Sequence, residues 1–370
     1  MLMSRYIVTT GGGLGNQIMT YALWYYLSRK SKAILYLRKN DLNKIFPLSC
    51  ASTLPNKFID IYIAFYKRYT GYLSVLLKRS SIFDFLKFLK LPLIVVDYPE
   101  WNDYLFWEDI REEMKRCLSF MPDNNIRNIK LLNRIRECNS VSIHVRRGDY
   151  QNNVYWRLML GDICDEIYYN QAIDRVSKLV SNPVYFVFSD DISWVKDNLR
   201  FDNAVFVDWN VKEESYRDIQ LMSCCKINIL ANSTFSLVST WLNSNLAPIR
   251  IVPSKWTNFY NDDLLNKYIP KDWIVLDNKK PMVSIIIKDE ISFESIKNLL
   301  KQSFTDYEII CNSDQYNNMD PRISTLQPSG KFYYIYNSYV DNLNFIQKGY
   351  LHNWLSKILQ KEITNSKQNR

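Results

Sequence analysis

The run Val-Ser-Ile-His-Val-Arg-Arg-Gly-Asp-Tyr, residues 141–150, carries the strongest structural signal in this chain. Apolar residues alternate with polar ones at a period of two, which predicts a buried strand that ends before Gly148. Arg146 and Arg147 then lie at the carboxyl end of that strand. Two buried arginines are costly without an anion, and a guanidinium group matches the oxygens of a diphosphate. An ion pair from Arg147 to Asp149 is the structural alternative.

A glycine-rich segment near the N-terminus also lies between a predicted strand and a predicted helix. Residues 6–10 predict a strand, and residues 18–30 predict an apolar helix. The intervening Gly-Gly-Gly-Leu-Gly-Asn-Gln, residues 11–17, lets the backbone at Gly13 and Gly15 approach an anion at the positive end of the helix dipole.

A third segment, Asn-Ser-Thr-Phe-Ser at 232–236, follows the apolar run 227–230. Its side chains and amides are suitable donors to phosphate, and a helix N-cap is an equally good explanation because Asn and Ser are preferred caps. The candidate residues are Asn232, Ser233, Thr234, Phe235 and Ser236.

Strand and helix patterns alternate along most of the chain, which predicts parallel sheets and an α/β fold. Ligands of such sheets bind at the carboxyl ends of the strands, where the three polar segments are expected. We predict a Rossmann-like domain at 1–139, a second one at 140–278, and an α/β extension at 279–370.

The composition narrows the class of protein. A chain of 370 residues, 47% of them hydrophobic, is long enough for two domains with cores. No run approaches the ~20 apolar residues that span a bilayer, and the N-terminus lacks a signal-peptide pattern. Seven cysteines without metal-ligand spacing favour reduced thiols, so we expect a cytoplasmic protein.

The net charge of +9 favours anionic partners. Residues 58–91 interleave basic with aromatic side chains, which suits either ordinary surface helices or peripheral contact with the inner face of a membrane. We expect no nucleic-acid partner, because the basic residues are dispersed and no recognisable module is present.

Four motifs in this order resemble glycosyltransferase family 11, the inverting alpha-1,2-fucosyltransferases that use GDP-fucose. They are Gly-Gly-Leu-Gly-Asn-Gln at 12–17, His-Val-Arg-Arg-Gly-Asp-Tyr at 144–150, Phe-Ser-Asp-Asp at 188–191 and Asn-Ser-Thr-Phe-Ser at 232–236. The resemblance covers residues 5–278 and implies a GT-B-like fold, with two facing Rossmann-like domains around donor and acceptor. One departure is Leu237-Val238, where the family usually has aromatic residues, and it bears on fine specificity.

The resemblance implies metal-independent transfer of L-fucose from GDP-fucose to the 2-hydroxyl of a terminal β-galactoside, without a cofactor. The acceptor would be an oligosaccharide or lipid-linked glycan of polysaccharide or O-antigen biosynthesis. A metal-independent enzyme must stabilise the leaving β-phosphate with fixed cations and amides, so Arg146 and Arg147 are the expected catalytic residues. His144 is a candidate base or a ligand of phosphate or ribose, and Asp149 is the alternative base.

The other candidate residues belong to the same expected site, and none is expected to bind a metal. Asn16 would contact the fucose or the diphosphate, and Asp190 or Asp191 would accept hydrogen bonds from guanine. Asp191 is equally suited to cap the helix at 192–199. The full donor-binding set is Gly13, Gly15, Asn16, His144, Arg146, Ser189, Asp190, Asp191, Asn232, Ser233, Thr234, Phe235 and Ser236.

The last segment resembles the opening of a family 2 glycosyltransferase, with strands at 281–287 and 306–311 and a helix at 293–302. Asn-Ser-Tyr at 337–339 stands where that family has a metal-binding Asp-x-Asp, and without those carboxylates a metal–diphosphate site cannot form. We therefore expect a catalytically silent half-domain, or an unrelated α/β extension.

Two other functions fit part of the sequence. An NAD-dependent oxidoreductase is disfavoured because the glycine spacing is not Gly-x-Gly-x-x-Gly and the second strand ends in Arg38-Lys39 rather than an acidic residue. A non-catalytic GDP-sugar or glycan-binding protein stays open, as does transfer of another GDP-sugar.

Overall fold

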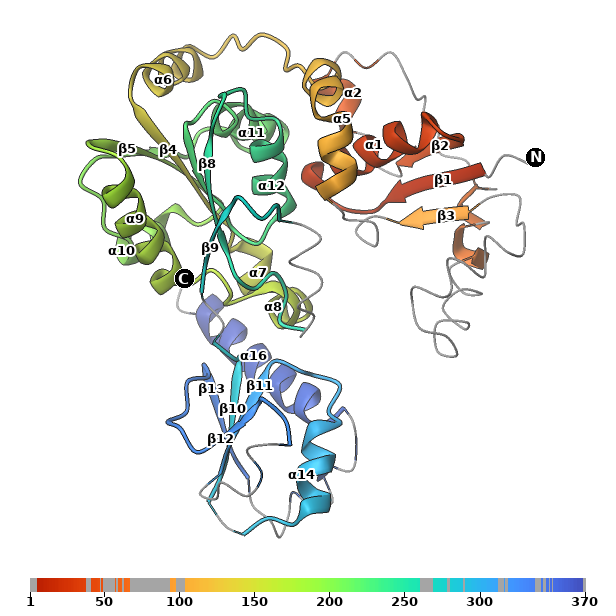
Figure 1. Ribbon diagram of the computed structural model, residues 1–370, viewed down its shortest axis with the longest axis vertical. Helices are drawn as coiled ribbons and strands as arrows, with labels where there is room; N and C mark the ends of the chain where they lie inside the picture. Colours follow the sequence, from red (N-terminus) through yellow and green to blue (C-terminus); the bar gives the residue numbers. More distant parts are fainter. Residues whose placement is uncertain are drawn as a thin grey trace.

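The computed structural model describes residues 5–37, 41–46, 48, 94–97, 104–259, 269–277 and most of 280–368, together with parts of 57–66 (Figure 1). These residues form three separate parallel sheets with helices packed on them, so the expected α/β, GT-B-like fold class with a C-terminal extension is confirmed. Most of the segment 58–91, proposed to contact a membrane, lies outside the described residues. Among the helices that are described, none is long and apolar enough to cross a bilayer.

The first unit is a three-stranded sheet in the order β2-β1-β3. The helix expected at 18–30 spans Leu14–Ser28, because only the first three glycines of the turn stay outside it. Gly15 therefore lies in the first helical turn. The elements are β1 (Arg5–Thr10), α1 (Leu14–Ser28), β2 (Lys32–Leu37), α2 (Leu42–Ile45), β3 (Ile94–Asp97) and α5 (Tyr104–Cys117).

The second unit is a six-stranded sheet in the order β6-β5-β4-β7-β8-β9. Strand order reverses between β4 and β7, so their carboxyl ends flank a topological switch point, the usual ligand site of a doubly wound sheet. The elements are α6 (Ile126–Glu137), β4 (Asn139–Val145), α7 (Gly148–Asn152), α8 (Val154–Leu160), α9 (Glu166–Leu179), β5 (Pro183–Ser189), α10 (Ile192–Asn198), β6 (Ala204–Val207), the 3-10 helix η1 (Lys212–Ser215), α11 (Tyr216–Met222), β7 (Ile227–Ile229), α12 (Thr234–Trp241), β8 (Ile249–Pro253) and β9 (Ile274–Leu276).

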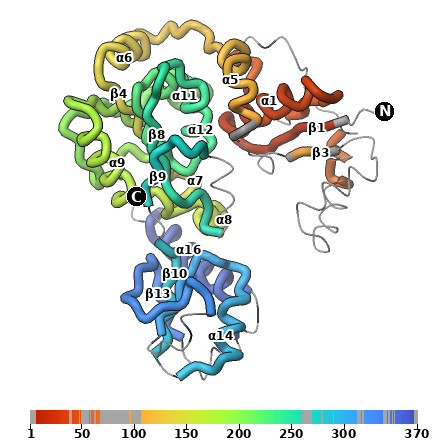
Figure 2. The backbone as a smooth tube through the Cα atoms, viewed as in Figure 1, coloured from red at the N-terminus to blue at the C-terminus, as the bar shows by residue number. Residues whose placement is uncertain are grey.

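The C-terminal module is a four-stranded sheet in the order β12-β11-β10-β13. It packs on α8 of the second unit through its last helix, and Leu158 of α8 belongs to its apolar core (Figure 2). Buried Arg157 binds both Asp162 (2.9 Å) and Glu362 of that helix (2.9 Å). The elements are β10 (Val283–Ile287), α14 (Phe293–Leu300), β11 (Tyr307–Cys311), β12 (Ile323–Ser324), β13 (Phe332–Tyr336) and α16 (Tyr350–Gln368).

The first and second units share one apolar core. Helices α1 and α12 lie side by side (Figure 1), and their buried faces belong to a single cluster with β1 and α5. Trp241 of α12 is in ring contact with Trp107 of α5 (6.0 Å between centroids) and with Trp273 (5.4 Å). These aromatic contacts join the two units through large buried side chains.

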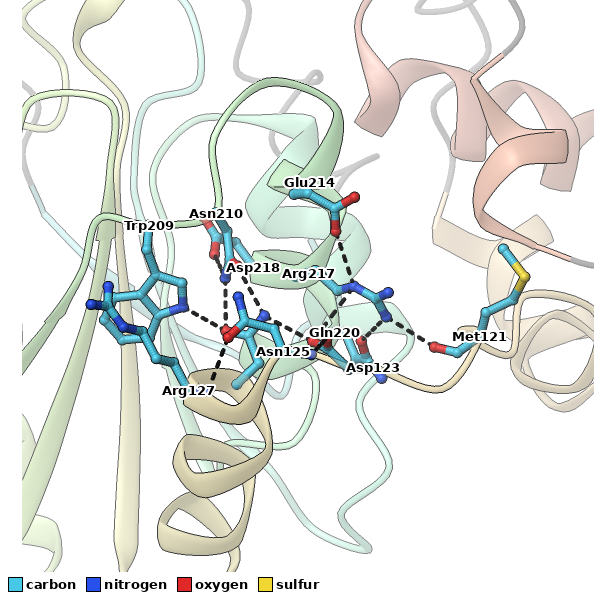
Figure 3. Close-up of polar contacts among 11 residues, drawn as sticks. Met121, Asp123, Asn125, Arg127, Trp209, Asn210, Glu214, Arg217, Asp218 and Gln220 are labelled. Atoms are coloured by element: carbon cyan, nitrogen blue, oxygen red, sulfur yellow. Dashed lines mark hydrogen bonds and ion pairs between the residues drawn. The ribbon is translucent and has the colours of Figure 1, made fainter.

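The chain crosses from the first unit to the second between α5 and α6, and this crossing is held by a polar network (Figure 3). Helix α6, which precedes the predicted boundary at 139/140, packs against the second sheet through Leu131 and Ile135. Arg217 of α11 donates to the Met121 carbonyl (2.9 Å) and pairs with Asp123 (3.5 Å). The crossing segment is therefore fixed to α11 by a buried guanidinium group.

The same network continues to a buried carboxyl group. Asn128 donates to Asp123 (2.8 Å) and to Asn210 (2.9 Å), and Asn210 in turn donates to Asp218 (2.8 Å). Trp209 donates to the Asn128 side chain (2.7 Å). Burial raises the pKa of Asp218 to about 7, although the hydrogen bond from Asn210 opposes that rise.

The raised pKa of Asp218 predicts a pH-dependent free energy of unfolding. The native carboxyl binds its proton more tightly than in the unfolded chain, where the pKa is 3.8, so stability falls as the pH rises from about 4 to about 7. In the variant Asp218→Asn this loss should disappear, and the variant should be the more stable protein above pH 7. Melting temperatures between pH 5 and 8 test this, with Asp174→Asn, an exposed carboxyl paired with Lys178, as the control. Parallel profiles for the wild type and Asp218→Asn would contradict the assignment.

Candidate active site at the switch point of the second sheet

The two arginines at the end of β4 are paired with the two aspartates at the end of β5. Arg146 Nη1 lies 3.0 Å from Asp190 Oδ2, and Arg147 Nε lies 3.3 Å from Asp191 Oδ2. Val145 is opposite Ser189 in the parallel pairing of β4 with β5. The residue after each strand forms the first ion pair, and the residue after that forms the second. The ion pairs thus continue the strand register beyond the last backbone pair.

The expected pairing of Asp149 is wrong in its partner. Asp149 Oδ1 binds Arg146 Nη2 at 2.8 Å, not Arg147. The reason is geometric, because Asp149 lies in the first turn of α7, where it is three residues from Arg146. Arg146 therefore lies between two carboxylates, and its guanidinium is 35% exposed, which leaves donors available at the surface.

Two aromatic residues that the sequence analysis did not select hold the arginine side chains. The Arg147 guanidinium lies 4.0 Å from the ring centroid of Trp194 in α10, and that of Arg146 lies 5.6 Å from the ring of Tyr150. Tyr150 is the last residue of the motif at 144–150, so the sequence offered a signal for it. Nothing in the sequence pointed to Trp194, because its contact with Arg147 depends on how α10 packs after β5.

The carboxylates at the end of β5 have structural roles as well. Asp191 caps α10 by accepting from the Trp194 amide (3.2 Å), and its own amide donates to Ser189 Oγ (2.9 Å). Asp190 accepts from the Arg147 amide (2.8 Å). A Cβ at Gly148 would lie 2.7 Å from Asp190 Oδ2, so a larger residue there would displace the Asp190 carboxylate that pairs with Arg146. The capping explanation for Asp191 is therefore confirmed.

His144 is buried in β4, two residues before Arg146. Its Nδ1 is 2.6 Å from Ser236 Oγ, its ring stacks on Phe235 at 5.3 Å, and its carbonyl accepts from Tyr169 (3.0 Å). Burial lowers the pKa of His144 to about 4; the nearby Asp190 opposes this shift and Arg146 adds to it. The imidazole is therefore neutral near pH 7 and packed against the start of α12.

The start of α12 lies against the glycine turn of the first unit. Thr234 Oγ1 donates to Asn16 Oδ1 at 2.7 Å. A Cβ at Gly15 would lie 2.7 Å from the Phe235 amide nitrogen, so this glycine allows the close approach of α1 to α12. Gly13, the residue before α1, has nothing within 4 Å of such a Cβ. The turn therefore contributes both an interdomain contact and an open backbone position.

The other polar residues of this segment are held by the backbone. Ser233 caps α12 by accepting from the Phe235 amide (3.3 Å), which confirms the capping explanation for that serine. Asn232 donates to the carbonyls of Leu160 (3.0 Å) and Trp256 (3.1 Å), so its side chain ties α8 to a later loop. Its amide group is already engaged by these contacts.

Leu237 and Val238, where the chain departs from the family pattern, are buried in the core shared by the two units. Their packing against α1 means that this departure concerns the interdomain core. The expectation that it bears on fine specificity finds no support in their position.

The structure thus brings together the arginines, His144, Asp149, Ser189 to Asp191, and the start of α12, with Asn16 joining from the first unit. Within the described part of the chain, no group of three or more His, Cys, Asp or Glu side chains is arranged to hold a metal ion. The arrangement offers two guanidinium groups and the N-terminal amides of α12 to an anion at the switch point.

Comparison with known proteins agrees with this geometry. The family model described as glycosyl transferase family 11 matches residues 4–277. The chain is 30% identical to an alpha-1,2-colitosyltransferase of Escherichia coli, over 74% of this chain and all of that protein. It is 30% identical to the O-antigen biosynthesis glycosyltransferase WbnK of Escherichia coli, over 66% and 92% of the two chains. It is 22% identical to the galactoside alpha-(1,2)-fucosyltransferase 2 of Mus musculus, over 65% and 69%. The chain therefore belongs to glycosyltransferase family 11.

Proposed function

We propose that this protein transfers L-fucose from GDP-fucose to the 2-hydroxyl of a terminal β-galactoside, with inversion and without a metal. The observation that carries the proposal is the pair Arg146 and Arg147 at the switch point of the second sheet, beside the N-terminus of α12. Similarity to a galactoside alpha-(1,2)-fucosyltransferase supports the donor and the linkage.

In the proposed reaction the acceptor oxygen forms a bond to the anomeric carbon while the bond from that carbon to the β-phosphate breaks. Negative charge develops on the departing GDP, and Arg146, Arg147 and the α12 amides stabilise it. Asp190 and Asp191 hold the arginines, and one of them would accept hydrogen bonds from guanine when the donor binds.

The proton of the attacking hydroxyl passes to a weak base in this scheme. Asp149 is the better candidate, because its carboxylate is 43% exposed beside Arg146. His144 is neutral and its Nδ1 is engaged by Ser236, so we assign it to positioning the start of α12. A weak base suffices when the sugar–phosphate bond breaks ahead of attack.

A second donor is favoured by a specific finding. One relative, aligned over its full length, is named an alpha-1,2-colitosyltransferase. Colitose is the 3-deoxy analogue of L-fucose. Similarity to an O-antigen biosynthesis enzyme favours a bacterial surface glycan, or its lipid-linked precursor, as the acceptor. We place the reaction in the cytoplasm or at the inner face of the membrane.

The test supplies GDP-fucose and GDP-colitose separately, with lactose or N-acetyllactosamine, in the presence and absence of EDTA. Mass spectrometry detects the added sugar, and a 2-specific fucosidase reports the linkage. EDTA-resistant transfer of fucose, reversed by that fucosidase, is the expected result. Transfer of colitose but not fucose would show that GDP-colitose, not GDP-fucose, is the donor. A protein that neither transfers a sugar nor binds GDP would refute the proposal.

A further inference from the structure

Helix α8 exposes two adjacent aromatic side chains close to the candidate active site. Tyr155 is 59% exposed and Trp156 is 41% exposed, and their rings meet edge to face with centroids 4.9 Å apart. Two large aromatic side chains in contact at the surface form a preorganised apolar platform, because each constrains the other.

The orientation of α8 is fixed, so this face cannot turn inward. Asn153 caps the helix by accepting from the Trp156 amide (3.1 Å). Directly after the two aromatic residues, Arg157 is buried in its ion pairs with Asp162 and Glu362, and Leu158 is buried in the core of the C-terminal module. The second unit and the C-terminal module therefore hold the two aromatic rings outward.

The platform is joined to the arginines by a short stretch of chain. Only α7 and Asn153 separate Arg147 from α8, and a Cβ on Gly161, just after α8, would lie 2.5 Å from the Tyr150 carbonyl. The Tyr150 ring lies beside Arg146 (5.6 Å). At 1.5 Å per residue, Trp156 is about 8 Å along the helix from Gly161, the residue that meets the Tyr150 carbonyl, and this is the scale of one to two sugar residues. Figure 1 shows α7 and α8 together at this end of the second unit.

We propose that Tyr155 and Trp156 form an acceptor subsite that binds the sugar residue attached to the reacting galactoside. The inference rests on the proposed function and names the part of the acceptor that the protein recognises. The C–H face of a pyranose ring is apolar and packs against an aromatic ring, while its hydroxyl groups stay in water. The diphosphate site contributes nothing to this contact, so acceptor length and donor binding should respond separately to mutation.

The experiment compares two acceptors in the full-length protein. The specificity constant kcat/KM is measured with methyl β-galactoside and with N-acetyllactosamine, which adds one sugar residue. We expect the wild type to prefer the disaccharide, and the double variant Tyr155→Ala, Trp156→Ala to lose on the order of tenfold of that preference. The KM for GDP-fucose and the rate with the monosaccharide should not change.

The controls separate a loss of stacking from a loss of structure. Phe293→Ala removes an aromatic side chain that is 53% exposed on α14 of the C-terminal module, and it should leave the preference intact. Trp156→Phe keeps an aromatic face and should retain most of the preference. The melting temperature of each variant is recorded.

Each outcome has one meaning. An unchanged preference in a folded double variant overturns the subsite, and so does a wild type that does not distinguish the two acceptors. Equal losses with both acceptors, accompanied by a raised KM for GDP-fucose, would show that the residues support the donor site and would also overturn it. A wild type that modifies neither acceptor would refute the proposed function itself.

Discussion

Replacing Arg146 with alanine is expected to lower kcat for fucosyl transfer by about 10²- to 10³-fold. The variant removes a guanidinium that lies between Asp149 and Asp190, at 2.8 Å and 3.0 Å. Both carboxylates then lose the guanidinium that pairs with them, and they repel the donor diphosphate more strongly, so the KM for GDP-fucose should rise as well. Steady-state kinetics with GDP-fucose and N-acetyllactosamine measure both parameters.

Two companion variants define what the Arg146 result means. Arg146→Lys keeps the positive charge but loses the planar guanidinium that can donate two hydrogen bonds to a phosphate. This variant should therefore recover only part of the rate. Arg134→Ala removes a guanidinium on α6 whose contact is with Asn203 (3.4 Å), and it should not affect transfer. Near-normal turnover in a folded Arg146→Ala protein would remove this residue from the proposed mechanism.

Removal of the C-terminal module, by ending the chain after residue 278, is expected to leave little soluble protein. The module covers Leu158 and part of Phe259, and it supplies Glu362 to buried Arg157. Exposing this apolar face and removing one partner of a buried ion pair are both strongly destabilising. Soluble yield and melting temperature of the shortened protein are the measurements.

A repair variant tests the same explanation. The shortened chain carrying Leu158→Gln has a more polar α8 surface, and it should be recovered in greater amount. The family model ends at residue 277, which makes the outcome informative about the tail. A soluble and fully active fragment without any repair would show that the module is silent, as the missing Asp-x-Asp motif predicts.

The fold of the second unit was predictable because its signals are local. Each strand is an apolar run followed by a polar turn, and β4 and β7 lie within one or two residues of the predicted positions. Helix α8 was not predicted, since its buried residues face the distant C-terminal module rather than the sheet beside it. The network around Asn128 was also missed, because its partners come from three elements far apart in sequence.

The site shows the same limit at the level of single contacts. The residue types at the strand ends predicted an anion site, but not which aspartate meets which arginine. That choice follows from the register of β4 against β5, which sets Arg146 beside Asp190. His144 packs against Phe235 and Ser236, which lie more than ninety positions later in the chain. The sequence around His144 therefore could not predict these contacts.

The core around Trp241 has a consequence for the order in which the chain can fold. Trp107 is synthesised early, but its partner Trp241 and the neighbouring Trp273 come much later. At ~5–20 residues per second, the first sheet waits roughly 10–30 s on the ribosome before the side chains that complete its core emerge. During that interval the faces of α1 and α5 that later pack on Trp241 and Trp273 lack their native partners, so the emerging first unit exposes apolar surface that chaperones can bind.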